Sequence, residues 1–135
     1  MGPGQNGIQR NMTDTMNTPI EALEIAYPLR VERYELREGS AGAGHDRGGN
    51  GIVRALRILG HDARVSLQSD RRRYAPYSLH VGAGGTPGRN LVLRRDGRTE
   101  VQPGKAALTL GPGGHHRRDS ERAAVGAADD DGSRR

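Results

Sequence analysis

The chain has 135 residues, which suits one domain and is too short for two. Leu, Ile, Val and Phe supply only 23 of them, which indicates either a small core with long loops or part of a larger core. The sequence has no Cys, no apolar run long enough to span a bilayer and no apolar secretory segment at its start. We therefore expect a soluble, cytoplasmic protein without disulfides, thiolate metal sites or a Cys nucleophile.

The chain is basic, but its charge is dispersed. The net charge is +5, and 20 of the 21 basic residues are Arg, spread along the whole sequence. A phosphate-binding surface gathers its basic side chains in one place. The dispersion therefore argues against nucleic acid as a partner.

The first predicted element is a helix over residues 19–26. The sequence TPIE at its start has the form of a capping box, in which Thr18 is the N-cap and Glu21 bonds back to it. Apolar residues then recur on one face, and Pro28 ends the helix.

Strands are predicted from there to residue 110. The segment 29–37 alternates, but its apolar side changes midway, which a β-bulge or a crossing between two packing partners would explain. The further strands are residues 52–59, 63–68, a short one ending at Val81, a hairpin over 91–101 with a type I′ turn at Asp96-Gly97, and 105–110. The fold is therefore predicted to be mainly β, with a short N-terminal helix and a β-meander of about five strands.

Residues 114–135 hold one Val and no other large apolar residue. A segment of this composition cannot bury enough surface to offset its ordering entropy. We therefore expect a disordered C-terminal tail.

Three motifs give the chain a family resemblance: NTPIEALE, YPLRVERYELR and SDRRR, in this order and followed by a DG hairpin and PGK. With them, residues 2–113 resemble the C-terminal end of the hydantoinase B/5-oxoprolinase family. Family members are several times longer. The resemblance therefore implies that residues 1–113 are the C-terminal portion of that domain and part of a larger α+β subunit.

The tail departs from the family pattern, which continues with a Glu-Thr-Pro segment and a Trp-Gly end. Reading the bases of residues 114–126 one nucleotide later would permit those residues. We therefore hypothesise a frameshift near Gly113 and Gly114, which resequencing of the locus tests.

The resemblance implies a part of an ATP-dependent hydrolase of cyclic amides such as 5-oxoproline or hydantoins. In such systems an A-type subunit or domain binds ATP with Mg²⁺, and the B-type part supplies a divalent metal site in its N-terminal portion. The implied partners are therefore the A-type subunit and the N-terminal part of the B subunit. This fragment would bind no cofactor and be inactive alone. Within the family, an acetone carboxylase-like subunit is the alternative.

Two clusters are candidate substrate or interface residues. The first precedes the helix, whose free N–H groups favour an anion, although its members could equally hydrogen-bond only the loop. It consists of Asn11, Thr13, Asp14 and Asn17. In the second cluster, guanidinium groups could bind a carboxylate or phosphate, although a turn with solvated arginines would have the same sequence. It consists of Asp70, Arg71, Arg72 and Arg73.

No metal site is predicted, because the adjacent His115 and His116 have no further ligands nearby in sequence. The histidines at 45, 61 and 80 stand in separate segments and are expected at the surface. A hypothesis from another class also stays open. In it, the chain is a stand-alone basic module that binds nucleic acid or a protein through Arg71, Arg72 and Arg73.

Overall fold

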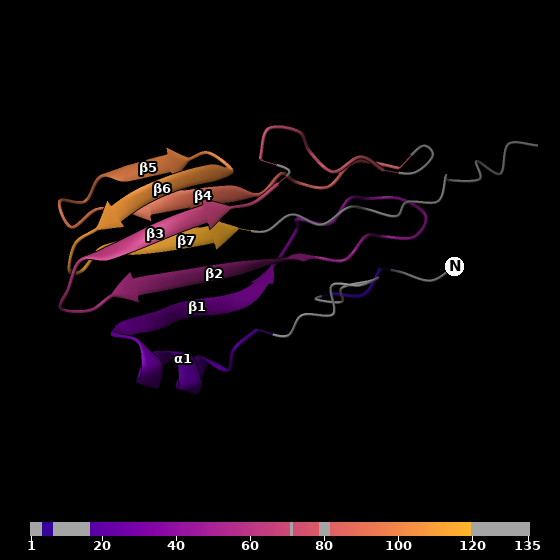
Figure 1. Cartoon of the computed structure of the whole chain (residues 1–135). Helices are drawn as coiled ribbons and strands as arrows, with labels where there is room; N and C mark the ends of the chain where they lie inside the picture. Colours follow the sequence, from indigo (N-terminus) through magenta and orange to yellow (C-terminus); the bar gives the residue numbers. More distant parts are fainter. Residues whose placement is uncertain (1–3, 7–16, 71, 79–81, 120–135) are drawn as a thin grey trace, which may run out of the picture.

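The computed structural model describes residues 4–6, 17–70, 72–78 and 82–119 (Figure 1). Within these ranges a short helix precedes antiparallel strands, which confirms the prediction of a mainly β fold. The elements are α1 (Ile20–Ala26), β1 (Leu29–Arg37), β2 (Gly51–Ile58), β3 (Ala63–Gln68), β4 (Arg89–Leu93), β5 (Thr99–Gln102), β6 (Lys105–Leu110) and β7 (His115–Asp119). No helix in the described ranges has the length and apolarity needed to cross a bilayer.

The strands form two layers (Figure 1). One is a five-stranded sheet in the order β1-β2-β7-β4-β5, and the other is the pair β3-β6. All pairs are antiparallel. The predicted meander order is therefore wrong, because β7 lies between β2 and β4, and β3 and β6 leave the main sheet. The predicted strand ending at Val81 falls on residues 79–81, outside the described part of the chain.

Strand β7 lies in the segment that we expected to be disordered from residue 114. Its sequence, HHRRD, carries no apolar periodicity, so hydrophobicity gave no signal for it. Its backbone pairs with β2 on one side and with β4 on the other, and these two ladders hold a polar strand in the centre of the sheet. The prediction of disorder is therefore wrong for residues 115–119, while residues 120–135 lie outside the described ranges.

The predicted irregularity in β1 is a β-bulge. The register against β2 shifts between Val31 and Arg33, so Glu32 is an extra residue. Without the bulge, strict alternation would place Tyr34 and Leu36 on the face opposite Val31. The bulge restores them to the same face, which explains why the apolar side changes midway along the sequence.

The core lies between the two layers. Its buried centre and the partly buried side chains packed on it come from five different strands and include Ile58, Val92, Leu110, Leu29, Ala63, Val65 and Leu108. Inward positions alternate along β3, as the sequence predicted for 63–68, and also along β6, which was predicted only as a strand over 105–110.

Helix α1 begins one residue later than predicted, and the capping box is wrong. Pro19 occupies the N-cap with an extended backbone (φ −51°, ψ 140°), and no side chain caps the helix. Thr18 therefore stays outside the helix, and Glu21 falls one position short of the place that a capping box requires. The helix is instead attached to the sheet edge by Glu24, whose Oε1 accepts the backbone N–H of Val31 at 2.7 Å.

The hairpin β4-β5 forms as predicted but with a different turn. Gly97 N donates to Arg94 O at 2.9 Å, and Arg94 N donates to Arg98 O at 2.8 Å. The loop therefore has three residues, with Gly97 in the left-handed region at φ 84°. This is the pattern of a type I turn closed by a glycine bulge rather than a type I′ turn. The carboxylate of Asp96 supports it by accepting the Arg98 N–H at 3.0 Å.

This turn is expected to weaken in acid. The backbone N–H of Arg98, and then its guanidinium, hold the pKa of Asp96 below its ordinary value. A carboxyl whose pKa is lowered by folding adds stability above its ordinary pKa, and this stability is lost as the pH falls through the folded value. We therefore expect the Gly97 amide NMR signal to shift over that acid range, and Asp96→Asn to remove the shift. Asp62→Asn is the control, and a titration that persists in Asp96→Asn would contradict the assignment.

Candidate functional site

The structure describes only Asn17 from the first predicted cluster. Its Nδ2 donates to the hydroxyl of Tyr34 at 3.0 Å, which fastens the chain before α1 to strand β1. The other members, Asn11, Thr13 and Asp14, lie outside the described residues. The bond of Asn17 is a structural one, and an anion site at this cluster stays a prediction.

The described arginines of the second predicted cluster, Arg72 and Arg73, contact different partners. Arg72 Nη1 donates to the carbonyl of Asp70 at 2.9 Å, and Nη2 approaches Asn90 Oδ1 at 3.4 Å. Arg73 instead places its guanidinium 5.5 Å from the ring centre of Tyr74. Arg71 lies outside the described residues. Arg72 is therefore part of an internal network, whereas Arg73 remains available at the surface.

Asn90, which is not among the site residues predicted from the sequence, is the centre of that network. It is 1% exposed, and its Nδ2 donates to Ser69 Oγ at 3.0 Å and to the carbonyl of Pro103 at 3.1 Å. Ser69 Oγ in turn donates to the carbonyl of Gly104 at 3.1 Å. Asn90 and Val92 share a strand face, so a polar residue at an inward position was the available signal.

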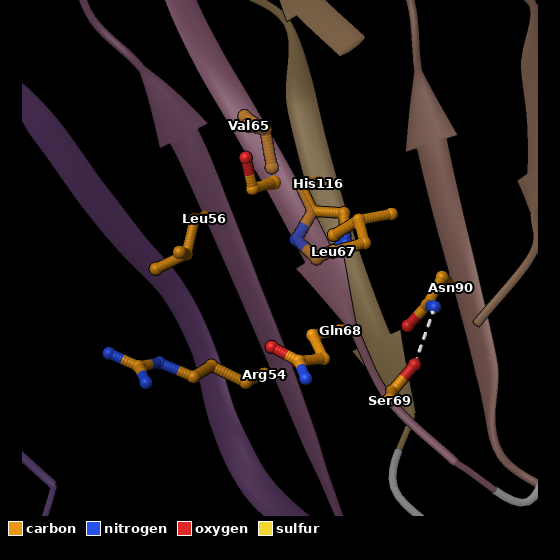
Figure 2. A pocket seen from close by; sticks show the side chains of 9 residues that line it. Arg54, Leu56, Val65, Leu67, Gln68, Ser69, Asn90 and His116 are labelled. Atoms are coloured by element: carbon orange, nitrogen blue, oxygen red, sulfur yellow. Dashed lines mark hydrogen bonds between the residues drawn. The ribbon is translucent and has the colours of Figure 1, made fainter. Parts of the chain in front are cut away.

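A cavity of about 310 Å³ lies beside Asn90, between the two layers (Figure 2). Its walls come from β2, β3, β4 and β7 and consist of Arg54, Leu56, Val65, Ser66, Leu67, Gln68, Ser69, Asn90 and His116. Leucine and valine residues line part of it, while the polar lining residues are one Arg, one His, two Ser, one Gln and one Asn. This combination can hold an apolar group and orient a polar one beside it.

A second hollow, of about 570 Å³, lies at the β5 end of the sheet. Arg89 lines it together with Arg72 and Arg73. Because Arg89 is 16 residues from Arg73 in the sequence, this grouping was not predicted. Leu91 and Val101 form part of its floor. Arginines above an apolar floor suit a carboxylate or phosphate that carries an apolar portion.

The histidines do not form a metal site in the described part of the chain. His115 Nδ1 lies 2.6 Å from Glu32 Oε2, and Arg57 Nη1 lies 3.6 Å from the other oxygen of the same carboxylate. Nowhere in the described ranges do three His, Asp or Glu side chains gather as a metal ion would require. No catalytic step through a metal is therefore assigned to these residues.

The remaining histidines are placed individually. The side chain of His45 is exposed, as predicted, and its Nδ1 lies 3.8 Å from Asp46 Oδ1. His61 Nδ1 lies 2.6 Å from the carbonyl oxygen of Leu59. His80 lies outside the described residues, whereas His116 is buried between β2 and β4.

Comparison with known proteins places this fold in a family. The sequence model of the family described as hydantoinase B/oxoprolinase matches residues 1–120. The chain is 39% identical over 100 residues to the 5-oxoprolinase of Dictyostelium discoideum. This alignment covers 72% of this chain and 8% of that protein. It is 35% identical over 120 residues to 5-oxoprolinase 1 of Arabidopsis thaliana, covering 82% of this chain and 9% of that one. The chain thus spans less than a tenth of the length of these two relatives.

A solved structure shows the same fold. The ATP-dependent caprolactamase of Pseudomonas jessenii matches with a TM-score of 0.65 and 25% sequence identity, over 82% of this chain and 20% of that chain. The family match extends through β7, so it includes the strand that completes the main sheet. On this combined sequence and structural agreement, the chain belongs to the hydantoinase B/oxoprolinase family.

Proposed function

We propose that the chain is the β-sandwich portion of the B-type subunit or domain of an ATP-dependent cyclic-amide hydrolase. The observation that supports this most directly is the structural match of 82% of this chain to part of the ATP-dependent caprolactamase. The matches to two 5-oxoprolinases make 5-oxoproline and hydantoins the substrate class that we propose first. Such a complex would act in the cytoplasm.

In this proposal the chain supports the active site and the subunit contacts. The required ATP, Mg²⁺ and divalent metal would bind elsewhere, in an A-type partner and in the N-terminal portion of the B-type part. The described residues offer hollows and hydrogen-bonding groups that suit such a supporting role. The chain alone is therefore proposed to be inactive. Carboxylation, as in an acetone carboxylase-like subunit, is the alternative reaction.

The test uses the Dictyostelium discoideum 5-oxoprolinase from which the segment matching this chain has been deleted. We expect the truncated enzyme to lack 5-oxoproline-dependent ATP hydrolysis, and the full 135-residue chain to bind it and restore measurable activity. Hydantoin and caprolactam, assayed in parallel, compare the substrate classes. A chain carrying Leu110→Ala in its core is the matched control and is expected to restore less.

Two results would refute the proposal. One is full activity of the truncated enzyme without the chain, since the β-sandwich would then be dispensable. The other is failure of the chain to bind the truncated enzyme. Turnover by the chain alone would refute the narrower statement that it is inactive in isolation.

A further inference from the structure

The smaller layer of the sandwich has an open edge at β3. In the described ranges β3 pairs only with β6. Ser69 N donates to Gly104 O at 2.8 Å, so these two residues form a hydrogen-bonded pair. Along an antiparallel ladder, opposite residues alternate between hydrogen-bonded and non-hydrogen-bonded pairs. The N–H and C=O groups of Arg64, Ser66 and Gln68 therefore point away from β6, and no described group hydrogen-bonds to them.

The outer edge of β6 differs from that of β3. Arg94 Nη1 donates to the outward carbonyl of Thr109 at 3.0 Å. The same guanidinium is fixed by Glu100, whose two carboxylate oxygens each accept a hydrogen bond at 3.2 Å. A charged side chain on an edge strand discourages further pairing. The outward carbonyl of Thr109 on the β6 edge therefore already has a partner, whereas no described group bonds to the outward groups of β3.

The open edge of β3 faces an uncovered part of the large sheet. The 310 Å³ cavity lies along this edge, with Arg54 and Leu56 of β2 opposite Leu67 of β3 (Figure 2). Farther out, Tyr34 and Leu36 of β1 are 45% and 46% exposed. Tyr34 lies opposite Arg54 in the register, so both project from the face that β3 partly covers.

The widths of the two layers explain the gap. Neighbouring strands lie about 5 Å apart, so two strands cannot cover a sheet of five. The covered part includes the core at Val92 and Leu110, while the β1 side of the same face has no described strand above it. A third strand next to β3 would occupy this position and fill the cavity.

We propose that an extended segment of the parent enzyme, outside this chain, adds to β3 as a third strand of the smaller layer. The inference rests on the proposed function, because the segment belongs to the rest of that enzyme. The two 5-oxoprolinases, of which this chain spans 8% and 9%, have ample chain to supply it. Main-chain bonds to β3 give this strand affinity, and its alternate side chains give specificity.

The surroundings define the chemistry of the added strand. Its inward side chains are apolar, since they meet Leu56, Leu67 and Tyr34. One position carries a carboxylate, because the Arg54 guanidinium at the cavity lies 5.9 Å from the ring centre of Tyr34 and forms no ion pair with a described carboxylate. The outward side chains are polar, as are those of Arg64, Ser66 and Gln68 next to them.

The experiment measures binding of the full chain to the truncated Dictyostelium discoideum 5-oxoprolinase. Ser66→Pro removes an outward N–H of β3, which an edge strand tolerates, and is expected to weaken binding by on the order of tenfold. Ala107→Pro is the matched control, since Ala107 lies opposite Ser66 and its N–H points to the outer edge of β6, away from β3. Its binding is expected to equal that of the unchanged chain.

Amide hydrogen exchange of the unchanged chain provides a second measurement that needs no variant. The amides of Arg64, Ser66 and Gln68 are expected to exchange rapidly in the free chain and to become protected in the complex. Those of Val65 and Leu67 are expected to be protected in both states, because they bond to β6.

The outcomes separate the two proposals. Binding of the unchanged chain without new protection at these three amides overturns the β3 inference and leaves the proposed function standing. If Ser66→Pro lowers the melting temperature, its weaker binding could come from a damaged fold. The hydrogen-exchange result on the unchanged chain then decides the β3 inference. Failure of the unchanged chain to bind overturns both proposals. The free chain could also sediment as a dimer in which these three amides are already protected. That result would assign the β3 edge to a second copy of the chain and overturn the proposed segment of the parent enzyme.

Discussion

Leu110→Ala is expected to lower the free energy of unfolding by about 2–5 kcal/mol, the range for truncating a fully buried leucine. Leu110 is 0% exposed and packs with Ile58 and Val92 between the two layers. The cavity left by its side chain would open at the junction of both sheets, where few other large apolar residues can move in. Because small domains are stable by only about 5–15 kcal/mol, this single change removes much of the total.

Urea denaturation followed by circular dichroism measures this effect. Val101→Ala is the control, since Val101 is a β-branched residue on a strand but is 73% exposed. Its expected effect is within about 0.5 kcal/mol. A loss below about 1 kcal/mol for Leu110→Ala would contradict the assignment of Leu110 to the centre of the core.

Asn90→Leu is expected to destabilise the fold by about 2–3 kcal/mol, although it introduces an apolar side chain of similar size. The change removes the donor to the carbonyl of Pro103 and to Ser69 Oγ, and the acceptor that Arg72 approaches. A buried carbonyl that loses its donor retains the full cost of its lost hydration. Apolar packing alone cannot offset that cost.

The comparison with Ser69→Ala and Gln102→Leu tests this explanation. Ser69→Ala removes one partner of Asn90 and is expected to cost about 1 kcal/mol. Gln102 lies opposite Asn90 in the register but is less buried, so Gln102→Leu is expected to have a small effect. Equal losses for Asn90→Leu and Gln102→Leu would show that the Asn90 network contributes nothing specific.

The elements that sequence could predict are those whose signal is local. Residues 63–68 and 105–110 alternate cleanly, and both strands have the predicted bounds. The bulge in β1 was predictable because the change of apolar side is visible within nine residues. Strand β7 was not predictable in this way, since a strand of His, Arg and Asp owes its place to two neighbours far away in sequence.

The predictions of the helix cap and of the hairpin turn were wrong because two local sequence signals competed at each position. Pro19 satisfied the rule for the first helical turn, yet its extended backbone made it the N-cap and displaced Thr18. At the hairpin, Asp96 and Gly97 indicated a two-residue turn, but hydrogen bonding placed the glycine in a bulge instead.

The candidate site was harder to predict than the fold. The arginine cluster was visible in the sequence, but its division was not, because Arg72 meets Asn90 across 18 residues. The open edge of β3 has no sequence signal of its own. It follows from strand order, which depends on pairings between distant segments.

The position of β7 also determines when the main sheet can close during synthesis. Until residues 115–119 leave the ribosome, β2 and β4 have no strand between them, and the sheet exists only as the separate pairs β1-β2 and β4-β5. Each pair then presents an unpaired backbone edge, which is a template for aggregation. Closure requires contacts between segments about 60 residues apart, which slows folding. Nascent chains arrested before His115 should therefore depend on chaperones far more than chains that include Asp119.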